Sequence, residues 1–348
     1  PYEVLVAWRF LLGIGIGGEY PLSCTVTAEG ASAEGSALHM ALTYMMFQAG
    51  QLLAPSVALC CLYFELSPEL TWRLCLGTGS ALALLGTILR VGTMHESQAW
   101  LNTRASARES AVICNWATLR AVGYPLAGTM STYFLYDVAS WGVGSYTSSI
   151  FESPTRKGTL WYMLLINAMA TPGFILTLWM GRFGRRACQF VGFLGMAMCM
   201  VIVGICFDFA PQVVLVLIFG IQRIFDSAGP GATTFIIPGE IFPTAVRATC
   251  HGASAAAGKL GAFVGMYFFP TVESAIGYRG MLVLGGCVLL VGCACTALLT
   301  PPYDEETLRY LNSATKSDLF RTTEILWTKG FVHDDSSEGE ASSSLFEG

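Results

Sequence analysis

Charged side chains are scarce in this sequence of 348 residues. They make up 12% of it, against about one quarter in an ordinary soluble domain, whereas hydrophobic residues make up 53%. Many apolar runs of about 20 residues are long enough to cross the roughly 30 Å hydrocarbon core of a bilayer. The sequence therefore predicts a helical protein that crosses the lipid bilayer several times. The net charge of −5 argues weakly against a nucleic-acid partner.

Metal-ligand and disulfide patterns are lacking as well. The twelve cysteines contain no CxxC pair, and most lie in apolar runs, where they behave as small hydrophobic residues. The four histidines are too isolated from one another to form a metal cluster. No nucleophile–base pair or cofactor motif is recognisable, so we expect no enzyme activity, no cofactor and no metal.

A signal peptide is also lacking. The sequence begins at Pro1, and its first residues already belong to an apolar run. We therefore expect the chain to be part of a longer protein whose N-terminal segment is not included.

Nine apolar segments are long enough for transmembrane helices, and none alternates as the strands of a barrel do. Two polar stretches accompany them: a charged linker and an acidic, serine-rich tail that lacks the apolar content to fold. We therefore expect a partial N-terminal bundle (1–94), a cytosolic linker (95–120), a C-terminal six-helix bundle (121–299) and a disordered cytosolic tail (300–348). The predicted spans are 4–27, 38–62, 72–94, 121–143, 159–180, 187–207, 213–237, 251–270 and 279–299.

The distribution of basic residues predicts the orientation in the membrane. Arginines gather in the linker, in "GRFGRR" (181–186) and at the end of "PGEIFPTAVR" (238–247), whereas the alternate loops hold few basic residues. Cytoplasmic loops are enriched in lysine and arginine. The linker, these two segments and the tail are therefore expected in the cytosol.

Two glycine-containing motifs resemble nucleotide-binding loops but lack the required context. "GIGIGG" (13–18) lies inside an apolar segment instead of following a strand, so Gly13 and Gly17 fit a small-xxx-small face for helix packing better. "GASAAAGKL" (252–260) has five residues between its glycines instead of four, and Leu260 where Ser or Thr is needed. Neither motif predicts nucleotide binding.

Ionisable residues inside the apolar segments are the strongest indication of function. A charge near the middle of a bilayer costs at least roughly 2.5–3.5 kcal/mol, so such a residue normally faces a cavity or a partner. Glu19 precedes Tyr20-Pro21, where the proline can break the helix, as happens at transporter sites. Glu19 either serves such a site or pairs with Arg9 and only stabilises the bundle.

Asp137 and Lys259 are the other two residues of this kind that we single out. Asp137 shares one helix face with Tyr133 and Trp141, four residues away on either side. It is either a proton carrier, since burial favours the protonated form of a carboxyl group, or a structural aspartate. Lys259 either binds an anion or a carboxylate, or forms a structural ion pair with Asp226 or Glu240. The remaining polar residues in these segments include Gln48, Gln51, Gln222, Arg223, Asp226, Thr233 and Thr234.

Four segments carry a resemblance to a known family. They are "RFLLGIGIGGEYPLS" (9–23), "FLYDVAS" (134–140), "GRFGRR" and "GEIFPTAVRATCHGASAAAGKLGA" (239–262). They resemble, in turn, the fourth helix, the seventh helix, the loop between helices eight and nine, and the junction of helices ten and eleven in the phosphate:proton symporters of fungi and plants. That family belongs to the major facilitator superfamily. The resemblance runs from about residue 8 to 310 and implies an all-α fold with helices four to twelve present.

The resemblance also implies roles for individual residues. Glu19 falls on the family's proton-linked acid, Arg9 on its fourth-helix arginine, and Asp137 on the aspartate that contacts both substrate and proton. The chain is thus expected to take up inorganic phosphate with protons by alternating access, as a multi-pass protein of the plasma membrane. The implied substrate-binding residues are Tyr20, Gln48, Tyr133, Asp137, Trp141 and Lys259.

Departures from the family pattern keep other functions open. The family's tryptophan and tyrosine around the aspartate are exchanged here, as Tyr133 and Trp141, and Gly231 replaces its tenth-helix asparagine. These changes favour a sugar or organic-ion carrier of the same superfamily, although Lys259 opposes a cationic substrate. The absence of helices one to three favours a receptor or remnant that does not transport.

Overall fold

A computed structural model of the chain describes residues 2–30, 36–93, 116–179, 183–242 and 244–301. Every regular element in these ranges is a helix, which confirms the predicted all-α class for the described part. Most of the predicted linker and almost all of the predicted tail lie outside the described residues.

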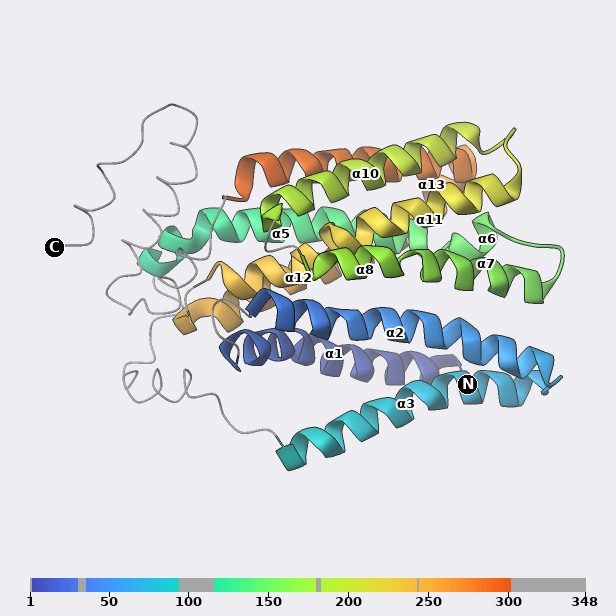
Figure 1. Ribbon diagram of the computed structural model, residues 1–348, viewed down its shortest axis with the longest axis horizontal. Coiled ribbons are helices and arrows are strands. Elements are labelled where there is room, and N and C mark those ends of the chain that lie inside the picture. The colour runs from blue at the N-terminus through green and yellow to red at the C-terminus, as the bar shows by residue number, and fades with distance from the viewer. Residues whose placement is uncertain (1, 31–35, 94–115, 180–182, 243, 302–348) are drawn as a thin grey trace.

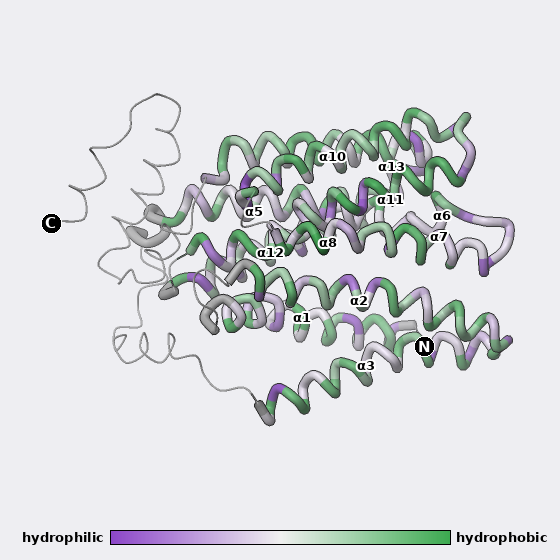
Figure 2. Tube along the Cα trace, viewed as in Figure 1, coloured by the Kyte–Doolittle hydropathy of each residue, from purple (hydrophilic) through white to green (hydrophobic). Residues whose placement is uncertain are grey.

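The helices follow the apolar runs of the sequence and form two groups. The first group is α1, α2 and α3, which lie together on one side of the molecule (Figure 1). The second group contains the remaining helices, α5 to α13. Hydrophobic residues cover most of their length, and hydrophilic residues occur mainly near helix ends and at a few interior positions (Figure 2). The elements are α1 (Tyr2–Gly30), α2 (Ser36–Tyr63), α3 (Pro68–Thr93), α5 (Trp116–Gly144), α6 (Thr147–Ile150), α7 (Arg156–Met169), α8 (Thr171–Thr177), α10 (Arg185–Cys206), α11 (Gln212–Ala228), α12 (Pro230–Glu240) and α13 (Thr244–Leu299).

Six stretches in the described ranges are long and apolar enough to cross a membrane, judged by length and composition. The last of them contains the two predicted spans 251–270 and 279–299. The predicted spans 4–27 and 121–143 coincide with α1 and α5, which are helical over 29 residues each but are not among the six stretches. The six are Leu38–Tyr63, Pro68–Gly92, Arg156–Thr177, Arg185–Cys206, Gln212–Glu240 and Val246–Leu299.

Glycine and proline explain where long helices break. Gly277 has φ 67° and ψ 178°, in the left-handed range of φ that glycine adopts readily, and it divides α13 into two helices. Pro230 lacks a backbone N–H and follows Gly229, where the chain leaves the helical conformation between α11 and α12.

Proline does not always have this effect. Ala170, between α7 and α8, keeps helical dihedrals (φ −70°, ψ −22°) although Pro172 follows. Pro21, which was expected to break its helix, lies inside the continuous α1.

The two groups of helices are joined by a small apolar core. Side chains of α1 and α2 pack there against side chains of α8 and α12, and the rings of Tyr44 and Phe174 stack with centroids 5.1 Å apart. We call this set the inter-half cluster. Its buried members are Cys24, Met40, Ala41, Tyr44, Ala170, Phe174, Ala232, Phe235 and Ile236.

A buried ion pair connects the start of α10 to the end of α12. Arg185 donates from Nε and Nη2 to the two carboxylate oxygens of Glu240, at 3.0 and 3.1 Å. The side chains are only 4% and 2% exposed. A buried charge is costly without its partner. This bidentate ion pair therefore fixes the position of the start of α10 relative to the end of α12.

Helix α13 approaches α5 closely at glycines. A Cβ atom placed on Gly261 would lie 2.2 Å from the carbonyl oxygen of Phe134, and one on Gly265 would lie 2.4 Å from that of Val138. Gly13 and Gly17, in contrast, have no such neighbour within 4 Å among the described residues. The predicted packing face on α1 is therefore not formed in this part of the chain, and α13 contains the glycines that pack closely.

We expect Gly261→Ala to lower the free energy of unfolding by about 1–3 kcal/mol, because the added methyl group must displace the backbone of α5. Gly86→Ala is the matched control: this glycine lies inside α3 with nothing within 4 Å, so the helix should gain up to about 1 kcal/mol. Melting temperatures of the purified proteins in detergent measure both changes. Equal melting temperatures for the two variants would contradict this account of the packing.

Candidate functional site

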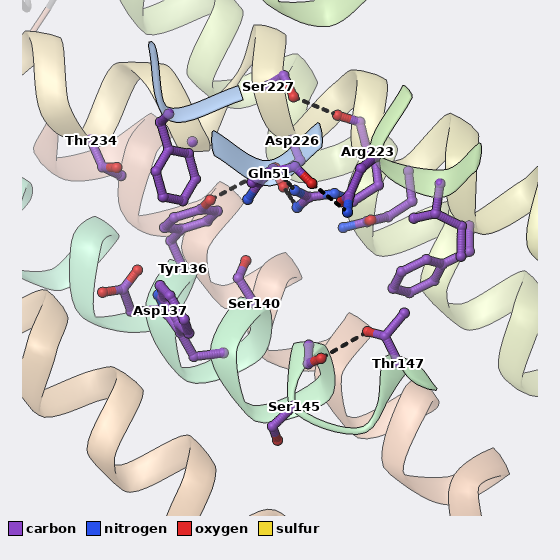
Figure 3. Close-up of a pocket in the computed structure, with 18 of the residues that line it drawn as sticks. Gln51, Tyr136, Asp137, Ser140, Ser145, Thr147, Arg223, Asp226, Ser227 and Thr234 are labelled. Carbon is purple, nitrogen blue, oxygen red and sulfur yellow. Dashed lines mark hydrogen bonds and ion pairs between the residues drawn. The ribbon is translucent and has the colours of Figure 1, made fainter. Parts of the chain in front are cut away.

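A cavity of about 380 Å³ lies between the two groups of helices. On one side its wall contains Tyr44 and Phe174, which also belong to the inter-half cluster. In the other direction the wall reaches Ser145 and Thr147, beyond the last turn of α5 (Figure 3). The charged residues of the wall form two separate clusters.

The first cluster is centred on an ion pair between α13 and α5. Lys259 Nζ lies 3.3 Å from Asp137 Oδ2. Asp137 is 1% exposed, whereas the lysine side chain is 43% exposed and borders the cavity. Gly258 explains the approach: a Cβ there would lie 2.4 Å from the ring of Tyr133, so only glycine lets α13 come this close to α5.

Three aromatic rings surround the ammonium group of Lys259. Their centroids lie 5.1 Å (Tyr20), 5.8 Å (Tyr133) and 5.6 Å (Trp141) from Nζ, within the range of cation–π attraction. The predicted common face of Tyr133, Asp137 and Trp141 is confirmed, because all three contact the same lysine. We call these five residues the lysine cluster.

The second cluster is centred on Arg223 and Asp226 of α11. Arg223 Nη1 donates to Asp226 Oδ2, and its Nη2 donates to Gln51 Oε1 of α2 at 2.8 Å. Tyr136 of α5 donates its hydroxyl to the other carboxylate oxygen of Asp226, also at 2.8 Å. Figure 3 shows this arrangement, which we call the arginine cluster. One cation and one carboxylate make it neutral overall.

Gln48, a predicted substrate-binding residue, is not among the side chains that line the cavity. Its Nε2 donates to the carbonyl oxygen of Asn167 at 2.6 Å and to Thr171 Oγ1 at 3.3 Å, across the contact between α2 and the α7–α8 region. Gln51, about one turn further along α2, faces the cavity instead. Gln48 therefore links the two groups of helices in this structure.

Glu19 and Arg9, the other predicted proton-linked residues, also lie off the cavity. Glu19 accepts a hydrogen bond from Arg90 Nη1 of α3 at 2.5 Å, and its side chain is 47% exposed. Its partner is thus Arg90, and the predicted pairing with Arg9 does not form. Among the described residues, no acid lies within ion-pair distance of Arg9.

The two alternative partners suggested for Lys259 are occupied elsewhere. Asp226 is paired with Arg223, and Glu240 with Arg185. Lys259 instead pairs with Asp137. The prediction of a structural pair with Asp226 or Glu240 was therefore wrong, and the lysine remains beside the cavity.

Gly231 explains one of the departures seen in the sequence. A Cβ atom at this position would lie 2.6 Å from the hydroxyl of Tyr44 and 2.8 Å from the carbonyl oxygen of Asp226. A side-chain amide cannot enter this space without moving its neighbours. Tyr44 and the arginine cluster thus occupy the volume that an asparagine would need.

Sequence reasoning recognised Gln51, Arg223 and Asp226 as polar residues but gave only Asp226 a role, as an alternative partner of Lys259. It did not single out Tyr136. The sequence does not show that these residues are in contact, because Gln51, Tyr136 and Arg223 come from three different helices. The signal that was present is the occurrence of Gln222, Arg223 and Asp226 within five residues of an otherwise apolar segment.

Comparisons with known proteins agree with this architecture. The sequence profile described as "Sugar (and other) transporter" matches residues 1–122 and 143–314. A probable inorganic phosphate transporter 1-6 of Arabidopsis thaliana is 27% identical over 91% of this chain and 75% of its own length. A putative inorganic phosphate transporter 1-13 of Oryza sativa subsp. japonica is 30% identical over 85% of this chain and 68% of its own length.

A third relative is matched over a smaller share of its own length. The inorganic phosphate transporter PT2 of Toxoplasma gondii is 31% identical over 84% of this chain, but the chain spans only 53% of that protein.

Solved structures show the same fold. The proton:xylose symporter XylE bound to 6-bromo-6-deoxy-D-glucose has a TM-score of 0.75 at 22% identity, over 88% of this chain and 73% of that one. The inward open conformation of XylE from E. coli has a TM-score of 0.57 at 21% identity, over 83% of this chain and 68% of that one. At these identities the likeness shows the fold alone. The profile match and the rice relative go further: this chain is a multi-pass membrane transporter chain that belongs to the sugar (and other) transporter family.

Proposed function

We propose that the protein takes up inorganic phosphate together with protons by alternating access. The observation that carries this proposal is the ion pair between Lys259 and Asp137 inside the cavity. The relatives named as inorganic phosphate transporters support the same substrate. Since the chain spans 53–75% of these relatives, the activity of the whole protein is part of the proposal.

The pair couples a proton to an anion through simple electrostatics. When Asp137 is ionised it neutralises Lys259, and an anion gains little at this site. When Asp137 takes up a proton, the ammonium charge is left for the substrate. At an effective dielectric near 20 and a separation of 4 Å, that attraction is about 4 kcal/mol, before the cost of removing water from the anion. Phosphate and proton therefore bind together.

Alternating access then requires the two groups of helices to separate at one end and close at the other. The contacts that must open include the inter-half cluster, the bonds from Gln48 and the bond between Gln51 and Arg223. We propose that Gln48 reaches the substrate only after this change. We also propose that Glu19, which is paired here with Arg90, exchanges a proton, because it precedes Tyr20, whose ring contacts Lys259.

The membrane and the orientation are further parts of the proposal. We place the protein in the plasma membrane, with the helix ends that carry Arg185, Arg186 and Arg247 in the cytosol, because basic residues favour that side. Fluorescence microscopy of the tagged protein checks the membrane. Fluorescence found only at internal membranes would contradict the assignment to the plasma membrane.

We expect Lys259→Gln to weaken phosphate binding by about 100-fold or more, since the variant loses the charge that attracts the anion. Lys157→Gln is the matched control, because that lysine lies over the ring of Tyr63, away from the cavity. Binding of radiolabelled phosphate to purified protein measures both, with arsenate, glucose and an organic cation as competitors. If glucose competes and arsenate does not, the protein is a sugar carrier.

Asp137→Asn removes the titratable group but keeps the shape of the side chain. Uptake of phosphate driven by an inward proton gradient should fall to background, whereas exchange of internal for external phosphate continues. Asp208→Asn is the control, since Asp208 forms an exposed pair with Arg279. Gradient-driven uptake at the wild-type rate in Asp137→Asn would show that the aspartate is structural, and Glu19→Gln tests the second acid in the same assay.

A further inference from the structure

The arginine cluster has no part in the mechanism just described, yet it forms a large share of the cavity wall. We propose that the cavity accepts a phosphate monoester of a small hydroxylated alcohol. The phosphate group lies at Lys259 and the hydroxyl groups lie at the arginine cluster. This inference rests on the proposed function, because it uses the same lysine to bind the phosphate.

Charge decides what the arginine cluster can bind. Arg223 and Asp226 neutralise each other, so a second anionic group gains no net attraction there. Their hydrogen-bonding capacity is not exhausted, however. The guanidinium has five N–H donors, and the carboxylate has about four lone-pair positions, of which Arg223 and Tyr136 use two. A hydroxyl group both donates and accepts, and therefore suits this mixture.

Unpartnered polar atoms point to the same kind of ligand. Gln222 is 2% exposed and lines the cavity, and its Oε1 has no hydrogen-bond partner among the described residues. The hydroxyl of Ser140, also in the wall, has none in that part of the chain either. Buried polar groups are rarely left without partners, because the loss of hydration is not compensated. Both atoms are buried in this structure, and a ligand with hydroxyl groups supplies partners to them when these side chains turn towards the cavity.

Size and shape also favour an ester over free phosphate. A cavity of about 380 Å³ falls within the range of roughly 300–1,000 Å³ that is typical of sites for organic ligands. Inorganic phosphate has five heavy atoms and leaves most of this volume unused. Aromatic rings of Phe47, Phe174 and Trp141 line the wall and offer apolar faces to the carbon atoms of the alcohol.

The two clusters are placed to hold the two ends of one molecule. Tyr136 bonds to the arginine cluster, and its neighbour Asp137 bonds to the lysine cluster. Adjacent residues of an α-helix point about 100° apart, so α5 presents both clusters to one cavity from different directions. A neutral sugar would leave Lys259 without an anion, and free phosphate would leave the arginine cluster without a ligand.

The test measures how well ligands displace radiolabelled phosphate from the intact purified protein. Glycerol 3-phosphate is compared with methyl phosphate, an ester without hydroxyl groups, and with glycerol. We expect glycerol 3-phosphate to compete about tenfold better than methyl phosphate, as two added hydrogen bonds would allow, and glycerol not to compete. Gln222→Leu should reduce this ratio to about twofold or less. Gln212→Leu, in the same helix but outside the cavity, should keep it.

Two results overturn the inference in different ways. If phosphate binds but glycerol 3-phosphate competes no better than methyl phosphate, the arginine cluster does not bind the alcohol, and the proposed function stands. If phosphate does not bind and glucose does, both proposals fail. Should Gln222→Leu aggregate on size-exclusion chromatography, Ser140→Ala provides the same comparison of ratios.

Discussion

An ammonium group between membrane-spanning helices needs a counter-charge, and Asp137 supplies it for Lys259 at 3.3 Å. The close approach of α13 to α5 and the position of the aromatic rings both serve this ion pair. α13 reaches α5 only because Gly258 and Gly261 leave room for Tyr133 and the backbone of α5. The approach places the lysine among three aromatic rings, which interact favourably with a cation but cannot neutralise it. The aspartate alone sets the net charge of this end of the cavity, so its proton decides whether an anion is attracted.

A second constraint is that the two groups of helices touch through few polar bonds. The inter-half cluster is apolar, and Gln48 adds hydrogen bonds to a backbone carbonyl and a hydroxyl. Gln51 accepts one further bond from Arg223, which keeps its own partner Asp226 in α11. Contacts of this kind can separate without leaving a charge unpaired. The ion pair of Arg185 and Glu240, in contrast, lies within one group, where it can remain intact while the groups move. The distribution of bonds thus suits two rigid units that change their relative position.

Much of the fold could be predicted from the sequence, because apolar runs of about 20 residues fix the helices. Proline was a poor guide to the helix ends, since Pro21, Pro55 and Pro125 lie inside continuous helices. The face shared by Tyr133, Asp137 and Trp141 followed from their spacing, and the structure confirms it. Helical spacing does not predict which residues of different helices form a pair. Glu19 pairs with Arg90 of α3, 71 residues away. Gln51 instead of Gln48 faces the cavity because of the rotation of α2, which apolar periodicity does not resolve when the whole helix is hydrophobic.

The central claim is that phosphate binds to Lys259 only as Asp137 takes up a proton. The most direct measurement is the number of protons taken up when phosphate is added to the purified protein in a weakly buffered solution with a pH indicator. We predict that the wild-type protein takes up about one more proton per bound phosphate than Asp137→Asn does, at the same pH and the same occupancy. Subtracting the variant removes the contribution from the ionisation of phosphate itself. Equal proton uptake by the two proteins would contradict the account.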